Sequence, residues 1–562
     1  MKNNIPLAEY PRMIMVRDSY RSLNGIWEYA IRKDKEIPLT FDGEIVVPFS
    51  PESPLSLVHK HVEPDDYLIY RKRFSVDEDF IKDHTILHFG AVDQIATIYL
   101  NGVPVGFNEG GFIPFSIFID SLIQQENELV VVVKDYSDTK FYSRGKQKRK
   151  RGQIWYTPQS GIYLPVWIES VTKDFVESLK ITPLFDQSKV EIIVYSSSKE
   201  DVVLTFNEEK HVFKANTPFF LELPNFHPWT PDNPYLYPFT VQIKDDTVSS
   251  YFAMRKISVE LAPDGHKRIM LNNEVVFQSG LLDQGYYHDG LLTPPSDEIL
   301  VNDILLAKKM GFNVLRKHIK LEWERFYYHC DRLGMMVWQD FVNGGEKYAF
   351  TVAHVPAFLN IHYNDTNYQR FGRSNAKGRM QFYLEARETI NHLYNYPSIV
   401  LWTVFNEGWG QFDARKLLKY VQKLDNTRLI DITSGWHDQG IGDFKSRHVY
   451  FRKYTHHQDS LKRATILSEF GGFSYKIDGH YFGVGNFGYK KFKDEASFTK
   501  AFIKLYEKEI LPSVKKGLCA AIYTQLSDVE DELNGLITYD RKVIKINPDE
   551  VLKINKKLTN SK

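Results

Sequence analysis

The sequence predicts two β-sandwich domains followed by a barrel of alternating strands and helices. Short apolar strands separated by turns fill residues 1–170 and continue through residues 171–257. From residue 258 onward, strand and helix patterns alternate. A chain of 562 residues is long enough for several domains. We therefore expect domain limits at 1–170, 171–257 and 258–562.

The first domain reads as a jelly-roll β-sandwich. Thr97-Ile98-Tyr99-Leu100 is followed by Asn101-Gly102, which is a strong signal for a two-residue hairpin turn. Leu129 to Val133 is a continuous apolar run, typical of a strand buried on both faces. No amphipathic helix of useful length appears in this part of the chain.

The second domain reads as an immunoglobulin-like β-sandwich. Its clearest strands are Glu191 to Tyr195, Val202 to Phe206 and Phe239 to Ile243, with a proline-rich corner between Pro224 and Pro238. Short strands of this kind within about 85 residues are typical of that fold.

The third domain reads as a (β/α)8 barrel, because eight strands with interposed helices fit into about 300 residues. A long helix is expected near 376–395. The expected strands are Val275–Phe277, Asn313–Arg316, Met335–Trp338, Ile399–Val404, Leu429–Thr433, His448–Tyr450, Ala464–Leu467 and Cys519–Tyr523.

Composition excludes several functional classes. The 71 basic and 71 acidic side chains cancel, so we expect no nucleic-acid partner. No stretch of about 18 apolar residues predicts a membrane span. Cys330 and Cys519 provide no disulfide framework, and the N-terminus has no apolar signal region, so the cytoplasm is the expected location. The sequence leaves homo-oligomer formation open.

Two glutamates are expected at the mouth of the barrel, where the carboxyl ends of the strands meet. Glu407 follows the fourth strand and Glu469 follows the seventh. Glycoside hydrolysis needs two carboxylates across one cavity: one protonates the leaving oxygen and the other attacks the anomeric carbon.

The sequence resembles glycoside hydrolase family 2 over essentially its whole length. Asn406-Glu407 matches the acid/base motif of that family, and Ser468-Glu469-Phe470-Gly471 matches its nucleophile motif. The motifs that resemble its two sandwich domains are Leu23-Asn24-Gly25-Ile26-Trp27, Val47-Pro48-Phe49, Trp229 to Tyr237 and Phe252-Ala253-Met254-Arg255.

The resemblance implies a retaining exo-β-glycosidase acting on an oligosaccharide or other glycoside. Glu407 would be the acid/base, Glu469 the nucleophile, and Asn406 the ligand of the sugar 2-hydroxyl. A β-galactoside is the expected substrate, with a β-glucuronide or β-galacturonide as the alternative. Members that cleave glucuronides carry an Asn-x-Lys pair for the carboxylate, which this sequence lacks at the matching place.

Further strand-end residues are candidates for the substrate site. Arg316 is expected to hold Glu469 ionised, because a nearby cation favours the charged carboxylate. The family usually has Arg, two residues and then His here, whereas this chain reads Arg316-Lys317-His318, which weakens the role of His318. The remaining candidates, each with loop hydrogen bonding as its alternative, are Asp283, Asp340, Trp436, His437, Tyr450 and Gln525.

We expect no cofactor and no required metal. Residues 483–488 fit G-x-G-x-x-G, but they do not lie between a strand and a helix as a dinucleotide site requires. The stretch Gln339 to Val342 lacks the Glu-and-His pattern of the magnesium-binding β-galactosidases in the family.

A basic stretch raises one question about substrate charge. Residues 144–151 carry six basic side chains in eight, which is typical of a solvated loop or of a loop that reaches the barrel mouth. In the second case its cations would favour a uronate. A rival of another class is a non-catalytic carbohydrate-binding protein on the same barrel.

Overall fold

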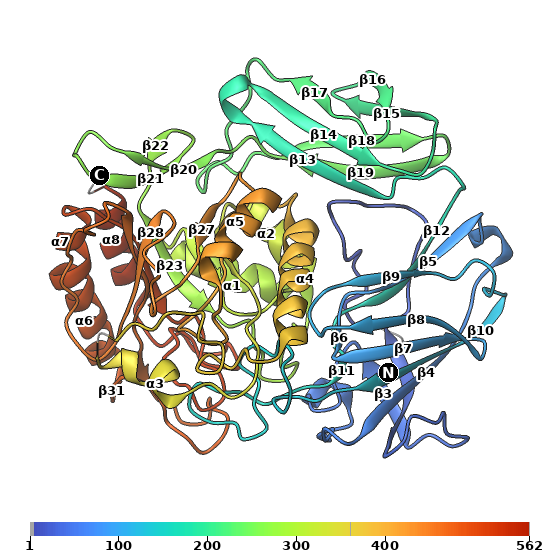
Figure 1. The fold of residues 1–562 in the computed structure, drawn as a ribbon, viewed down its shortest axis with the longest axis horizontal. Helices are drawn as coiled ribbons and strands as arrows, with labels where there is room; N and C mark the ends of the chain where they lie inside the picture. The colour runs from blue at the N-terminus through green and yellow to red at the C-terminus, as the bar shows by residue number, and fades with distance from the viewer. Residues whose placement is uncertain (1–4, 360, 561–562) are drawn as a thin grey trace.

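A computed structural model describes residues 5–359 and 361–560, and it contains two β-sandwiches and a barrel (Figure 1). In Figure 1 the first sandwich lies at the right in blue, the second at the top in green, and the barrel at the left. This architecture confirms the predicted fold class.

The first sandwich packs a four-stranded sheet against a six-stranded sheet around a shared apolar core. The four-stranded sheet has the order β1 (Tyr20–Ser22), β12 (Val166–Val171), β5 (His84–Phe89), β9 (Phe115–Phe118). The six-stranded sheet has the order β3 (Gly43–Val47), β2 (Gly25–Arg32), β4 (Tyr67–Ser75), β10 (Glu126–Lys134), β7 (Ile95–Leu100), β8 (Val103–Glu109). A two-stranded sheet joins β6 (Val92–Asp93) and β11 (Gly161–Ile162).

The predicted hairpin at Asn101-Gly102 is confirmed. β7 and β8 pair antiparallel on either side of these two residues. Their φ angles are 51° and 80°, the left-handed values that a tight two-residue hairpin turn demands at both positions.

The second sandwich packs a three-stranded sheet against a four-stranded sheet, and its predicted strands are confirmed. The first sheet has the order β13 (Ser178–Leu184), β14 (Lys189–Tyr195), β17 (Phe219–Glu222). The second has the order β16 (Glu209–Lys214), β15 (Asp201–Phe206), β18 (Tyr237–Ile243), β19 (Asp246–Phe252).

Eight parallel strands form the barrel. Around the sheet they run β27 (Leu429–Asp431), β26 (Ile399–Thr403), β25 (Met336–Asp340), β24 (Val314–Lys317), β23 (Gln278–Asp283), β32 (Leu518–Thr524), β29 (Ala464–Gly471), β28 (Phe444–Val449). The longer helices around them are α1 (Asp297–Lys309), α2 (Glu324–Leu333), α4 (Ala376–Leu393), α5 (Ala414–Leu424), α6 (Glu495–Leu505) and α8 (Pro548–Thr559).

The barrel is nearly closed, with a seam between β27 and β28. These two strands are the ends of the hydrogen-bonded order, and no ladder joins them within the described residues. No described helix lies between β27 and β28 or between β28 and β29. The seam therefore leaves one stretch of barrel wall without the usual helical cover.

The predicted strand limits need two corrections. Val275 belongs to a small sheet of β20 (Ile257–Leu261), β21 (Lys267–Leu271) and β22 (Glu274–Val275), and the first barrel strand begins only at Gln278. The sixth strand begins at Phe444, four residues before its predicted start. Polar residues at alternate positions obscured it: Lys445 and Arg447 are only half-buried on its outer side. The domain limits at 170 and 257 stay predictions.

A segment of the first sandwich reaches the mouth of the barrel. In Figure 1 it runs blue-green along the lower edge of the barrel. Ser143 forms an isolated bridge with Gly344, and the amides of Arg144 and Gly145 both donate to the carbonyl of Asn343 at 2.9 Å. We call residues 142–159 the arm.

Candidate active site

Glu407 and Glu469 are positioned by two strands of the barrel. Glu407 lies four residues after β26, in a left-handed conformation with φ 52°, followed by Gly408. A bridge between Asn406 and Ser434 holds this turn against the segment that follows β27. Glu469 lies within β29 and is buried.

The two carboxylates share one cavity, and His448 lies between them. One oxygen of each carboxylate and one His448 nitrogen all lie within 4.8 Å of one another. His448 Nδ1 is 2.8 Å from Glu407 Oε1, and its Nε2 is 3.5 Å from Glu469 Oε1. Retaining glycosidases separate their carboxyl groups by about 5–5.5 Å, and inverting enzymes by about 6.5–9.5 Å. The spacing fits the retaining class.

Burial affects the two carboxyls unequally. It raises the pKa of Glu407 to about 8, against the nearby cations Lys146 and Arg316. It also raises the pKa of Glu469, but His448, Arg316 and a hydrogen bond from Tyr450 oppose that effect. Glu407 is thus the carboxyl that keeps a proton at neutral pH, and Glu469 is the one whose ionised form has cationic and hydroxyl partners.

Arg316, on β24, forms hydrogen bonds with several polar side chains of the mouth. Its Nη1 donates to Glu469 Oε1 at 3.1 Å, and its Nη2 donates to Asn406 Oδ1 at 2.9 Å. Two further bonds of 3.0 Å join it to both oxygens of Asp340. The predicted contact between Arg316 and Glu469 is present, and Asp340 orients the guanidinium from behind.

Two buried amides in the mouth have groups without partners. Asn406 Nδ2, and both side-chain polar atoms of Asn343, have no hydrogen-bond partner among the described residues. Buried polar groups are normally satisfied, so an orphaned donor beside the acid/base is a candidate ligand for a sugar hydroxyl.

Tyr450 and Trp436 also lie at the site. The Tyr450 hydroxyl donates to Glu469 Oε2 and lies 3.0 Å from Thr524 Oγ1. Its ring stacks on Tyr489, with centroids 4.0 Å apart. The Trp436 ring lies 6.3 Å from the ring of His448.

Three predicted candidates are held by internal bonds instead. Asp283 accepts from Lys317 Nζ at 2.7 Å, within a buried ion-pair cluster. Both ring nitrogens of His437 contact backbone, the carbonyl of Val352 and the amide of Tyr363. Gln525 has its amide bonded on both sides, by Gln284 and Asn534.

His318 takes an indirect position. Its Nδ1 lies 2.8 Å from Asp340 Oδ2, and burial lowers its pKa to about 3, so the ring is neutral. It therefore orients Asp340, which in turn orients Arg316.

His448 lies at the site, whereas the sequence predicts it only as the first residue of the sixth strand. Ser446, His448 and Tyr450 are spaced by two. Residues at that spacing on a strand face the same side, and Tyr450 is a predicted site residue. That alternation is the signal that could have identified His448.

The arm lies at the mouth, and three of its six cations have carboxylate partners. Lys146 Nζ lies 3.7 Å from Glu532, and Arg149 and Arg151 pair with acidic neighbours at 3.1 and 3.3 Å. Lys148 Nζ lies 3.9 Å from the centre of the Trp155 ring, and the side chain of Arg144 donates to the Gly345 carbonyl. The positive charge of the basic stretch is therefore neutralised only in part.

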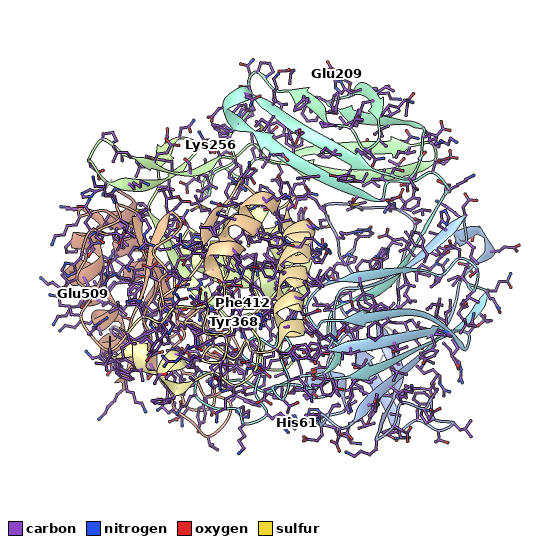
Figure 2. All side chains as sticks on the ribbon, in the orientation of Figure 1. His61, Glu209, Lys256, Tyr368, Phe412 and Glu509 are labelled. Carbon is purple, nitrogen blue, oxygen red and sulfur yellow. The ribbon has the colours of Figure 1, made fainter. Side chains whose placement is uncertain are left out.

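The loop that carries Glu407 packs against the arm and against α4. Trp155 of the arm contacts Trp409 with ring centroids 5.0 Å apart. Phe412 and Tyr368, both labelled in Figure 2 beside the lower end of α4, lie near the same loop. Phe412 packs edge-on against Phe382 of α4 at 5.6 Å, and the Tyr368 hydroxyl donates to Asp413.

Glu407, His448 and Glu469 are also the group of side chains whose donor atoms could surround a metal ion. These side chains already have partners, because His448 bonds to Glu407, and Glu469 bonds to Arg316 and to Tyr450. The arginine beside Glu469 is an unfavourable neighbour for a cation. This donor set fits acid–base chemistry better than metal binding.

Models of known domain families match most of the chain. "Glycosyl hydrolases family 2, TIM barrel domain" matches residues 288–543. "Glycosyl hydrolase 2 galactose-binding domain-like" matches residues 50–162, and "Glycosyl hydrolases family 2" matches residues 175–255.

Curated relatives carry two kinds of name. A "Beta-galactosidase" of Thermoanaerobacter pseudethanolicus is 25% identical over 410 residues, covering 67% of this chain and 50% of that protein. A "Beta-glucuronidase" of Streptococcus agalactiae is 24% identical over 426 residues, covering 71% and 68%. The chain thus spans about half the length of the first of these relatives.

Solved structures share the fold over nearly the full chain. An "Uncultured Clostridium sp. Beta-glucuronidase" superposes with a TM-score of 0.76 at 18% identity, covering 98% of this chain and 100% of that one. Within residues 5–359 and 361–560, no helix is both long and apolar enough to cross a membrane. With three matched domains in the order of the fold and a paired-glutamate site in the barrel, this chain belongs to glycoside hydrolase family 2.

Proposed function

We propose that this protein is a retaining exo-β-glycosidase, with Glu407 as acid/base and Glu469 as nucleophile. The observation that carries the proposal is the carboxylate pair in one cavity, with an oxygen of each within 4.8 Å of the other. The unequal surroundings of the two groups assign their roles.

The first step forms a covalent glycosyl-enzyme. A Glu469 oxygen attacks the anomeric carbon as the bond to the leaving oxygen breaks, and Glu407 transfers its proton to that oxygen. The high pKa of Glu407, about 8, keeps this proton available at neutral pH. Arg316 and the Tyr450 hydroxyl hold the attacking carboxylate in place.

The second step releases the sugar. Glu407, now ionised, takes a proton from a water molecule whose oxygen attacks the anomeric carbon, and Glu469 leaves as a carboxylate. Two inversions give net retention. The orphaned Nδ2 of Asn406 supports a role for this amide in binding the sugar 2-hydroxyl, an interaction that strengthens in the transition state.

We propose a terminal β-galactoside as the substrate, with a β-glucuronide or β-galacturonide as the second candidate. The names of the first curated relatives support the galactoside. The names of the superposed structures support the uronides, but those structures share only 18% identity. Carboxylate partners for three of the six arm cations weaken the feature that favoured a uronate.

A panel of nitrophenyl β-glycosides tests the activity and the sugar together. We expect turnover of the galactoside. The comparison substrates are the glucuronide, the galacturonide, the mannoside and the α-L-arabinoside. Absence of turnover on every sugar, with saccharide binding retained in calorimetry, would establish the carbohydrate-binding alternative instead.

Azide rescue tests the assignment of the two glutamates. Glu469→Gly should abolish turnover, and added azide should then give an α-glycosyl azide. Glu407→Gly should instead yield a β-glycosyl azide from an activated substrate, because the nucleophile is intact. Exchange of the two products would reverse the assignment.

The proposed location is the cytoplasm. Both cysteines, Cys330 and Cys519, are free and buried, as is common where thiols stay reduced.

A further inference from the structure

A cavity of about 80 Å³ opens at the seam between β27 and β28. Trp436 and His448 line its inner side, and His448 bonds directly to Glu407. One side chain therefore separates the cavity from the proposed acid/base. In this mechanism the acid/base protonates the leaving oxygen, so the cavity lies one side chain away from the group that faces the leaving group.

The cavity presents cationic groups without carboxylate partners. Arg447 is half-buried and Arg452 is exposed, and neither forms an ion pair with a carboxylate among the described residues. Lys445 differs, because it pairs with Asp438 at 2.6 Å. Guanidinium groups favour carboxylate and sulfate oxygens, which they can bind in a fork.

The arm differs from the seam only in part. Three of its cations meet Glu532, Asp138 and Glu530 at distances of 3.1–3.7 Å, whereas Arg144 and Lys148 contact a backbone carbonyl and the Trp155 ring. Arg447 and Arg452 are the arginines that line the seam cavity without a carboxylate partner among the described residues.

The size of the cavity suits a small charged group. About 10–15 Å³ of such volume is enough for one water molecule, so a cavity of about 80 Å³ has room for a carboxylate or a sulfate. The ring that carries this group would then lie at the rim.

Two exposed aromatic rings form that rim. Phe358 and Phe451 stack with centroids 4.8 Å apart, and they are 63% and 53% exposed. Their chain neighbours Leu359 and Arg452 line the cavity. Ring faces of this kind suit the C–H face of a sugar or an aromatic aglycone.

We propose that the seam cavity binds an anionic substituent, a carboxylate or a sulfate, on the leaving group of the substrate, with Arg447 and Arg452 as its ligands and Phe358 and Phe451 as the platform for the attached ring. This inference rests on the proposed function. It gives the enzyme a preference for acidic leaving groups that is independent of the sugar it cleaves.

The test compares leaving groups on the sugar that the panel identifies. The substrates are disaccharides of that sugar with a neutral, a carboxylated or a sulfated reducing unit. We expect the unmodified protein to prefer one or both acidic forms. In the double variant Arg447→Gln/Arg452→Gln, the ratio of kcat/KM for the acidic substrate to kcat/KM for the neutral substrate should fall about tenfold. Lys453→Gln, an exposed cation next in the chain, is the matched control and should keep the ratio.

Several outcomes would overturn the inference. An unchanged ratio in the double variant would do so, and so would an equal loss in Lys453→Gln, which would indicate surface charge in general. A change of oligomeric state in Phe358→Ala/Phe451→Ala without a change in the ratio would assign the rings to an interface between copies of the chain.

Failure of the proposed function gives a different pattern. In that case the unmodified protein turns over none of the neutral glycosides. Calorimetry with the neutral and the carboxylated disaccharide then tests the cavity alone. Tighter binding of the carboxylated form, lost in Arg447→Gln/Arg452→Gln, supports it, and equal binding rejects it.

Discussion

At the scale of single residues, the site depends on how three buried groups share charge. Glu407 and Glu469 are both removed from water, yet only Glu469 contacts a guanidinium. His448 contacts both carboxylates, and burial lowers its pKa to about 4, so the ring is neutral at pH 7. A neutral ring can hydrogen-bond to Glu407 through Nδ1 without adding a charge that would ionise that carboxyl.

The proton on Glu407 should set the alkaline limit of activity. The acid form is needed in the first step, so kcat/KM should fall as pH rises through about 8. Glu407→Ala should remove this limb and slow substrates with poor leaving groups by about 10²–10⁴-fold, with a smaller loss for activated aryl glycosides. Measured pH–rate profiles on both substrate types decide the point. A limb that persists in Glu407→Ala would belong to another group.

His448 should act through the acidic limb of the same profile. Its Nε2 lies 3.5 Å from Glu469 Oε1, and an N–H beside an ionised carboxylate favours the ionised form. Loss of this group in His448→Asn should therefore raise the pKa of Glu469 and move the acidic limb to higher pH. We expect kcat at neutral pH to drop about tenfold.

His448→Phe fills the same space without a polar atom, and it separates an electrostatic role from a packing role. If His448→Phe preserved the profile and the rate, the imidazole would only fill space, and its contacts with the two glutamates would have no effect on the kinetics.

At the scale of elements, the loop after β26 is braced from outside the barrel. Glu407 holds a left-handed backbone conformation, which is costly for a residue with a side chain and persists only where neighbours enforce it. The amide of Trp409 donates to the Asn406 carbonyl at 2.9 Å, and the ring of Trp409 packs on Trp155 of the arm.

Loss of the Trp155 ring should loosen this brace. Trp155→Ala should lower kcat about tenfold, because the acid/base would no longer be held in its productive position. The loss of stability should be small, about 1 kcal/mol for the aromatic pair. Trp155→Phe should restore most of the rate, and Lys150→Ala, exposed on the same arm, should change neither quantity. A fall in stability with unchanged kinetics would restrict the arm to a structural role.

At the scale of the whole molecule, buried ion pairs join the two sandwiches. Arg17 donates to Glu169 on β12 at 3.0 Å and to Asp246 on β19 at 2.9 Å. Its side chain is almost fully buried. Replacement of this one residue leaves the buried carboxylate of Asp246 without its guanidinium and Glu169 with Arg12 alone.

Arg17→Met should lower the free energy of unfolding by about 3–5 kcal/mol. Arg21→Met, which breaks the exposed pair of Arg21 with Asp77, should cost about 0–1 kcal/mol. Thermal unfolding of both variants makes the comparison, and equal shifts in Tm would refute it. Because nearby cations hold the pKa of Glu169 below its usual range, this stabilisation is present at neutral pH and is lost as the pH falls into the acid range.

Sequence alone sufficed for the three-part fold, for most of the barrel strands and for the position of the two glutamates at the barrel mouth. These features are local: apolar periodicity marks a strand, and the residue that follows a parallel strand must lie at the mouth. The positions of Arg316 and Tyr450 follow from the same rule, and the roles of all four residues stay predictions.

Only the tertiary structure decided which strand-end groups face the cavity. Asp283, His437 and Gln525 occupy equivalent chain positions, yet each is bonded to the body of the protein. His448 looked like a strand residue and proves to join both carboxylates. Side-chain direction and the partners that arrive from distant segments, such as the arm, depend on packing between elements, and no local pattern records that packing.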